Sequence, residues 1–249
     1  MSSGMKHGPS GANEKWFTTT HWSVVLAAGR TGSPDAEAAL EKLCQDYWYP
    51  LYAYVRRRGH GPHDAQDLTQ GFFATVLERN FLGSAEQTKG KFRSFLLGAL
   101  NNFLSRQRQR ALAGKRGGGK LMVPLDEESA ESLYALEDSS DTSPERAFEK
   151  RWAITLLEKA FASLRQEFDA AGKGKMFESL KGFLSDRTGS GDYGSAAAEL
   201  GMTPNAVAVS VHRLRQRYRE LVRMEVGHTV ASPGEIEAEM RHLFAALGQ

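Results

Sequence analysis

The sequence predicts an all-α protein made of two small helical domains joined by an acidic linker. Most apolar residues recur at three- and four-residue spacing, the period of one helix face, and strand-type alternation is nearly absent. Residues 87–125 hold nine Lys or Arg and no Asp or Glu, whereas residues 126–145 hold eight Asp or Glu and no Lys or Arg. The acidic stretch is typical of a solvated linker or of an internal competitor for the basic surface, so we place the domain boundary there.

Composition narrows the class of protein. A chain of 249 residues accommodates one large domain or two small ones. The single cysteine, Cys44, excludes an internal disulfide and a Cys-rich metal site, which suits a reducing cytosol. The first fifteen residues lack the apolar core of a signal peptide, and no apolar run reaches eighteen residues. We therefore expect a cytoplasmic protein without a membrane span.

The first half of the chain predicts three long helices. Residues 1–34 form a flexible N-terminus and a Trp-rich arm, in which Thr20 suits the N-cap of a short helix. Residues 35–122 then form the first domain, because their apolar residues follow the helical period. The three helices are expected at residues 35–58, 62–78 and 91–112. A Gly-rich loop beginning at Gly114 ends the third helix.

The second half predicts several more helices. The linker is placed at residues 123–145, the second domain at 146–225 and a C-terminal amphipathic extension at 226–249. Three of the new helices begin with cap chemistry, a Ser or Thr followed by proline at the first helical position. These starts are Ser143-Pro144, Thr203-Pro204 and Ser232-Pro233, with shorter helices at 175–185 and 195–200.

Residues 195–223 match a helix–turn–helix motif: a short Ala-rich helix, a turn containing Gly201, and a longer second helix. One side of the second helix is apolar, with Val207, Val211, Leu214, Tyr218 and Leu221. The opposite side carries Asn205, Val209, His212 and Gln216, flanked by Arg213, Arg219 and Arg223. A recognition helix needs this division between a core face and a face with base-edge donors and cations. An ordinary amphipathic surface helix is the alternative.

The third helix and its basic tail form a second candidate contact with nucleic acid. A long basic run of one sign is most often neutralised by nucleic acid, although a solvated face is the alternative. Aromatic residues interleaved with Arg and Asn suit single-stranded DNA, yet such phenylalanines more often belong to a core. Residues 114–120 fit part of a phosphate loop, but Leu121 replaces the required Ser or Thr and no strand precedes them. Contact of this loop with phosphate is therefore expected, rather than nucleotide hydrolysis.

No pattern of residues predicts catalysis or a bound metal. His60 and His63 have no third ligand at suitable spacing, so we expect two exposed imidazoles in a loop. The sequence contains no nucleophile-elbow motif and no conspicuous pair of carboxylates in an apolar setting. We expect a protein that is not an enzyme and that has no cofactor and no metal.

Several runs of residues resemble the extracytoplasmic-function type of bacterial RNA polymerase sigma factor. Residues 47–73, with the run DAQDLTQ at 64–70, and residues 91–110, beginning KFRSFL, look like conserved region two of that family. Residues 193–221 look like region four, and the resemblance covers roughly residues 35–225. The N-terminal arm and the C-terminal helix resemble a subgroup with larger extensions.

The resemblance implies a promoter-specificity subunit that directs transcription initiation. Its polymerase-binding residues would be Asp64, Asp67 and Gln70, on the helix that binds the clamp coiled coil. Its DNA-binding residues would be Asn101, Arg106, Arg108 and Arg110 at the minus-ten element, Lys115 and Arg116 in the basic loop, and Asn205, His212, Arg213 and Arg217 at the minus-thirty-five element. Asn101 matches the position near the flipped base, but Asn102 and Phe103 depart from the usual aliphatic residues. The identity of that base is therefore left open.

The implied partners are core RNA polymerase, through its clamp coiled coil and flap, and promoter DNA. An anti-sigma factor or a regulatory kinase is a further partner class that the sequence leaves open, and no membrane is expected. Two other functions are compatible with the same residues. One is a conventional helix–turn–helix transcriptional regulator that is not a polymerase subunit, and the other is a helical interaction scaffold that does not bind DNA.

Overall fold

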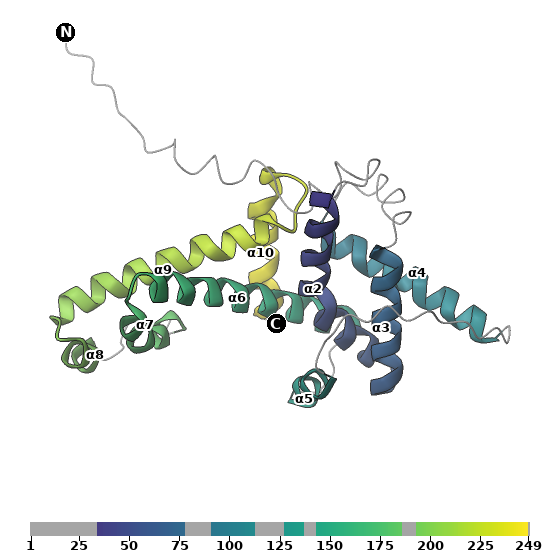
Figure 1. The fold of residues 1–249 in the computed structure, drawn as a ribbon, viewed down its shortest axis with the longest axis horizontal. Helices are drawn as coiled ribbons and strands as arrows, with labels where there is room; N and C mark the ends of the chain where they lie inside the picture. Colours follow the sequence, from purple (N-terminus) through teal and green to yellow (C-terminus); the bar gives the residue numbers. More distant parts are fainter. Residues whose placement is uncertain (1–33, 78–90, 113–126, 137–142, 186–192, 249) are drawn as a thin grey trace, which may run out of the picture. The chain divides into compact units, whose positions relative to one another are not determined.

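The computed structural model describes residues 34–77, 91–112, 127–136, 143–185 and 193–248, and all regular structure in these ranges is helical (Figure 1). The all-α prediction is thereby confirmed. The chain divides into two compact units, Met1–Ala153 with Gly227–Gln249 (unit 1) and Ile154–Val226 (unit 2). The expected short helix after Thr20 and the expected contacts of Lys115 and Arg116 lie outside the described residues.

Three long helices of unit 1 match the predicted ones closely. They are α2 (Pro34–Arg57), α3 (Pro62–Leu77) and α4 (Phe92–Leu112). The chain reverses between α2 and α3 at Gly59, whose φ of 89° lies in the left-handed region that glycine tolerates best. Fully buried aromatic rings from all three helices fill the core, among them Tyr47, Tyr54, Phe72 and Phe92. Burial of these large rings is the main contribution to the stability of unit 1.

The acidic segment contains a helix that the sequence did not predict, α5 (Glu127–Leu136). Glu131 of α5 accepts hydrogen bonds from Arg56 Nε at 3.0 Å and Arg56 Nη2 at 2.7 Å. Tyr52 donates its hydroxyl to the same carboxylate at 2.5 Å. At least this part of the acidic segment is therefore folded against α2, because its charge neutralises the basic C-terminal end of that helix.

Unit 1 is completed by the start of α6 (Pro144–Ala170) and by the C-terminal elements η4 (Pro233–Glu235) and α10 (Ile236–Leu247). The predicted cap at Ser232 is present as a capping box with Glu235. Ile236 and Leu243 of α10 are buried, and the N–H of Phe92 donates to the carbonyl of Thr229 at 3.1 Å. Ile236 and Leu243 of the C-terminal helix thus pack within unit 1, whereas Phe244 of the same helix is 56% exposed.

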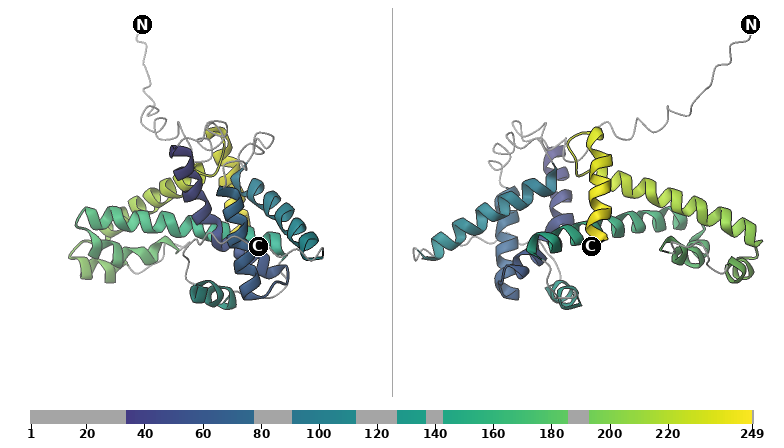
Figure 2. Two further views of the ribbon diagram at one scale, coloured as in Figure 1. Left: turned by 45° about the vertical axis from the view of Figure 1, so that its right-hand side comes forward. Right: turned by 180° about the vertical axis from the view of Figure 1, so that it is seen from behind.

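Unit 2 contains the rest of α6, α7 (Gly174–Leu180), η3 (Lys181–Leu184), α8 (Tyr193–Leu200) and α9 (Pro204–Gly227). Helices α6 and α9 lie side by side in both views (Figure 1 and Figure 2). The hydroxyl of Tyr218 donates to the carbonyl of Leu157 at 3.1 Å, and Lys159 pairs with Glu225 at 3.4 Å. This pairing fixes the rotation of α9 about its axis and so decides which of its faces is exposed.

Candidate nucleic-acid interface

The turn between α8 and α9 is built by local backbone chemistry. Gly201 has a φ of 63°, and the N–H of Met202 donates to the carbonyl of Ala197 at 2.9 Å, which ends α8. The hydroxyl of Thr203 then accepts from the N–H of Ala206 at 3.3 Å, which caps the N-terminus of α9. The predicted start of the long helix is therefore correct.

Helix α9 has the two faces that its sequence predicts. Its packed face buries Val207, Val211, Leu214 and Leu221. Its opposite face is exposed and carries Asn205, Val209, His212, Arg213, Gln216 and Arg219. Val209 is 44% exposed, which is unusual for a large aliphatic side chain in this structure. An exposed methyl group between amide, imidazole and guanidinium donors suits contact with a thymine methyl group in the major groove.

Two arginines of α9 have partners inside unit 2. Arg217 donates to both oxygens of Glu167, at 2.9 and 2.6 Å, and to Glu220 at 2.8 Å. The hydrogen bond from Arg217 holds the pKa of the Glu167 carboxyl below its ordinary value. Arg215 donates twice to the carbonyl of Phe183, at 3.0 and 2.7 Å. Arg213, in contrast, is exposed on the same face as His212.

Asn101 of α4 is held by two side chains, that of Tyr54 in α2 and that of Arg58, the residue that follows α2. Its side-chain oxygen accepts from the Tyr54 hydroxyl at 2.9 Å and from Arg58 Nη1 at 2.6 Å, and Arg58 Nη1 also lies 3.0 Å from the Tyr54 oxygen. Because Tyr54 is fully buried, this network fixes the orientation of a half-buried amide. The oxygen of Asn101 is used within the protein, which leaves its NH₂ group as the donor for a ligand.

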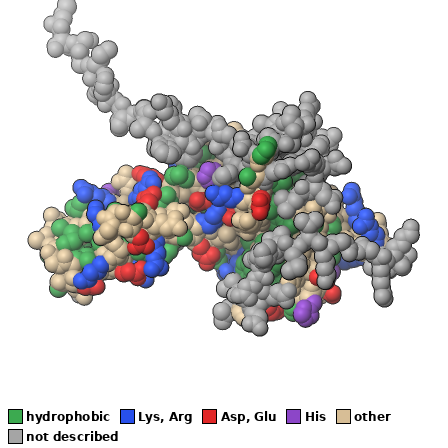
Figure 3. All heavy atoms as spheres, in the orientation of Figure 1, with side chains coloured by type: hydrophobic (Ala, Val, Ile, Leu, Met, Phe, Trp, Pro, Cys, Tyr) green, Lys and Arg blue, Asp and Glu red, His purple; other side chains and the backbone are tan. Residues whose placement is uncertain are grey.

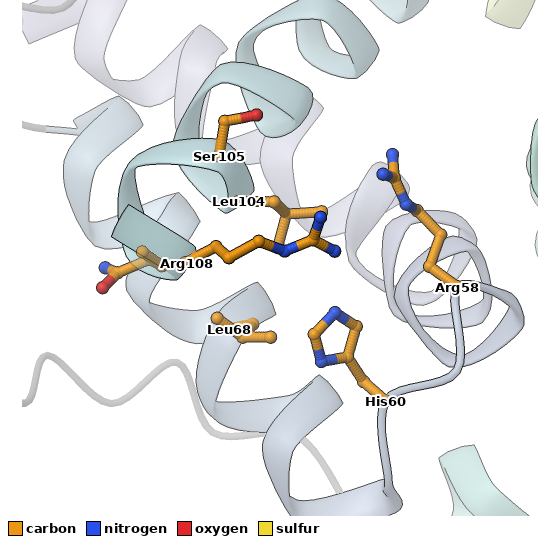
Figure 4. Close-up of a pocket in the computed structure, with 7 residues that line it drawn as sticks. Arg58, His60, Leu68, Leu104, Ser105 and Arg108 are labelled. Atoms are coloured by element: carbon orange, nitrogen blue, oxygen red, sulfur yellow. The ribbon is translucent and has the colours of Figure 1, made fainter. Parts of the chain in front are cut away.

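The far end of α4 is strongly cationic. Arg106, Arg108 and Arg110 are all exposed, and Lys and Arg side chains gather over this end of the helix (Figure 3). Arg106 and Arg110 are four residues apart and share one face, whereas Arg108 lies on the other side of the helix. Arg108 lines a cavity together with Arg58 and His60 (Figure 4). Arg58 is the last residue of the helix predicted at residues 35–58, and the run Arg-Gly-His after Arg57 is the signal in the sequence that could have indicated a cationic corner.

Helix α3 presents an acidic face. Asp64 and Asp67 are exposed and Gln70 is half-buried, and their three-residue spacing places them on one side of the helix. The opposite side is buried through Ala65, Thr69, Phe72 and Val76. The Thr69 hydroxyl donates to the carbonyl of Ala65 at 2.7 Å, so this buried polar group is satisfied. The two carboxylates are therefore available to a basic partner while the core side of α3 stays closed.

Within the described ranges, no group of three or more His, Cys, Asp or Glu side chains is placed to hold a metal ion. None of the helices in the described part of the chain has the length and apolar character needed to cross a bilayer.

Comparisons of the chain with known protein families, with curated proteins and with solved structures give no match. The candidate interface therefore stands on the geometry and charge of its own residues. Its two parts are the exposed face of α9 in unit 2, and Asn101 with the cationic end of α4 in unit 1.

Proposed function

We propose that this protein is a promoter-specificity factor of the extracytoplasmic-function sigma type, which binds core RNA polymerase and directs it to promoter DNA. The observation that carries the proposal is the exposed face of α9. Asn205, Val209, His212 and Arg213 combine amide, methyl, imidazole and guanidinium groups on one solvent-facing side. Such a face can contact base edges in a major groove while the buried valines hold the helix in its domain.

The second DNA contact in this proposal is made by α4. The NH₂ group of Asn101 is pre-oriented by Tyr54 and Arg58, and Arg106 and Arg110 extend the cationic surface along the helix. A pre-oriented donor beside a row of cations suits a melted strand, whose unpaired bases expose their hydrogen-bonding edges. The arginines bind phosphate, and Asn101 contacts a base.

The polymerase contact is assigned to Asp64, Asp67 and Gln70 on α3. In this arrangement the chain performs no chemistry of its own, and the polymerase supplies catalysis. When one of the two DNA contacts has formed, it keeps the second contact surface close to the same DNA and so raises its effective concentration. Neither contact therefore needs to bind tightly alone. A conventional regulator with the same helix–turn–helix would bind its duplex without polymerase.

Run-off transcription tests the proposal directly. Purified core polymerase is incubated with genomic fragments, with and without the full chain. We expect discrete transcripts only when the chain is present. The sigma-type assignment would be contradicted if no transcript depends on the chain. If the chain alone then binds duplex DNA sequence-specifically, the protein would instead be a conventional helix–turn–helix regulator.

Charge reversal at Asp67 tests the polymerase contact separately. Asp67→Arg should reduce co-purification with core polymerase and leave the fold intact, because the side chain is exposed. Glu41→Arg is the matched control, since Glu41 is an exposed carboxylate on α2. Equal co-purification of the two variants would contradict the assignment of this face.

A further inference from the structure

One apolar stripe of the C-terminal helix α10 is exposed in unit 1. Phe244 is 56% exposed, and Met240 and Leu247 of the same helix are half-buried. Spacings of four and three residues place these side chains on one side of α10, next to the side that buries Ile236 and Leu243. We name Met240, Phe244 and Leu247 the α10 stripe. Neighbouring apolar side chains that share an exposed surface are typical of an interaction site.

The α10 stripe has no role in the proposed contacts with DNA or polymerase. Among the side chains that the structure describes, the large apolar ones that are exposed are Phe244 and Val209. Val209 belongs to unit 2 and lies on the proposed recognition face of α9. Phe244 belongs to unit 1, and the proposed function leaves its exposure unexplained.

The sequence before α2 supplies a matching apolar segment. Residues 1–33 lie outside the described residues and precede the start of α2. Their sequence contains Trp22, Val25 and Leu26 at the spacing of one helix face. Thr20, two residues before the tryptophan, suits the N-cap of a short helix. A helix of this length depends on tertiary packing of its apolar face for stability, so the segment needs a surface to pack on.

The chain is long enough to bring this segment to the α10 stripe. Burial, and after it the charge of Glu239 in α10, raises the pKa of Tyr47 in α2, so the two helices are neighbours. At 1.5 Å per residue, Tyr47 lies about 20 Å from the start of α2 and Phe244 about 8 Å from Glu239. Neighbouring helices are separated by about 8–10 Å. The residues between Trp22 and α2 span up to about 40 Å when extended, which covers the sum of these steps.

A tethered segment of the same chain is favoured over a second copy of the protein. Stable dimers bury about 800 Å² on each partner. Three partly exposed side chains offer far less apolar surface than that. The tether also holds the segment at an effective concentration on the order of millimolar, which a second molecule does not reach in dilute solution.

We propose that residues 20–29 dock on the α10 stripe through Trp22, Val25 and Leu26. Docking removes the Phe244 ring from water and buries the apolar face of the segment against it. Because the opposite side of α10 is packed in unit 1, the contact joins the two ends of the chain within one domain. It needs neither DNA nor polymerase, so it can fail or hold independently of the proposed function.

Fluorine NMR of the full chain, labelled with 5-fluorotryptophan, tests the contact. The chain has four tryptophans, of which Trp48 and Trp152 are buried. Trp16→Phe and Trp22→Phe assign the two other signals. We expect a soluble nitroxide to relax the Trp22 signal of the wild type more slowly than the same residue in a synthetic peptide of residues 14–30. Equal relaxation in the chain and in the peptide would overturn the proposal.

Phe244→Ser and Val209→Ser form the matched pair. Each replaces an exposed apolar side chain with serine, so neither should unfold the protein. Phe244→Ser should abolish the protection of Trp22 from the nitroxide, and Val209→Ser should leave it unchanged. If Phe244→Ser also leaves the protection unchanged, the segment does not dock on the α10 stripe.

Urea unfolding of a double variant gives a second readout. Trp22→Ser and Phe244→Ser should each lower the unfolding midpoint, and the double variant should unfold close to the lower of the two, because either change alone already removes the contact. The losses from Trp22→Ser and Val209→Ser should instead add. Additive losses in the first pair would overturn the docking. Protection of Trp22 that disappears on dilution, together with a dimer in sedimentation, would assign the stripe to a second copy and overturn it as well.

Discussion

The carboxylate of Glu239 is completely buried in unit 1, where it accepts a hydrogen bond from Arg93 Nε at 2.6 Å. Lys91 Nζ lies 2.5 Å from its other oxygen, and Arg93 also contacts Glu149 of α6. The Arg93 guanidinium stands over the Trp152 ring, 5.2 Å from its centroid. These contacts connect the C-terminal helix α10 with the starts of α4 and α6, so the extension is an integral part of unit 1.

Removal of Glu239 should destabilise unit 1 strongly. Glu239→Ala leaves the buried Arg93 and its neighbour Lys91 without their main counter-charge, and we expect a loss of about 3–5 kcal/mol. Urea unfolding followed by tryptophan fluorescence measures it, because Trp48 and Trp152 are both buried. The exposed Glu41 is the control, and Glu41→Ala should change stability by less than about 0.5 kcal/mol. If Glu239→Ala lowers the free energy of unfolding no more than Glu41→Ala does, the buried contact is not stabilising.

Asn101 should contribute to stability through its oxygen and to strand binding through its NH₂ group. Asn101→Ala removes the 2.9 Å acceptor of the buried Tyr54 hydroxyl and leaves that hydroxyl only its longer 3.3 Å contact with Glu145. We expect a loss of about 1–3 kcal/mol. Asn101→Asp keeps an acceptor beside Arg58 and should retain stability, yet it removes the donor that the proposed base contact requires. Both variants should bind a single strand less tightly, and normal strand binding by Asn101→Asp would exclude the base contact.

The stability that α5 gains from packing against α2 should decrease at acid pH. Hydrogen bonding from Arg56 holds the pKa of Glu131 below its ordinary value of 4.5. A carboxyl with a depressed pKa in the folded state stabilises that state above its unfolded pKa and loses this contribution as pH falls through the folded pKa. The difference in unfolding midpoint between wild type and Glu131→Gln should therefore be largest near neutral pH and shrink as pH falls below 4.5. A difference that stays constant across this range would mean that the pair contributes no stability.

Two neighbouring arginines of α9 should differ in their effect on promoter binding. Arg213 is exposed on the proposed recognition face, and Arg213→Ala should cost about 1–3 kcal/mol of duplex binding if it contacts a base. Arg217 is paired with Glu167 and Glu220, so Arg217→Ala should cost less binding and at most about 1 kcal/mol of stability. Fluorescence anisotropy with the promoter found by transcription measures both. A larger loss for Arg217→Ala would place the DNA contact one turn further along α9, at Arg217.

Local features of the chain were predictable. The starts of α6 and α9 follow from Ser143-Pro144 and Thr203-Pro204, because capping needs only a side-chain oxygen and the next turn of backbone. The two faces of α9 follow from the helical period, and the buried Val207 and exposed Val209 agree with it. The position of Asp64 and Asp67 on one exposed side of α3 follows in the same way.

By itself the sequence determined the helical class, the main helix boundaries and the faces of α3 and α9, because these depend on spacing within one turn or a few turns. Only the tertiary structure decided that Arg58 meets Asn101, that Glu131 of the acidic segment pairs with Arg56, and that Glu239 is buried against Arg93. The partners in these pairs lie 43, 75 and 146 residues apart, and helical periodicity carries no information about which helices pack together. Charge pairing across such distances is set by the packing of apolar cores, which brings each cation to its carboxylate or amide only after the helices have assembled.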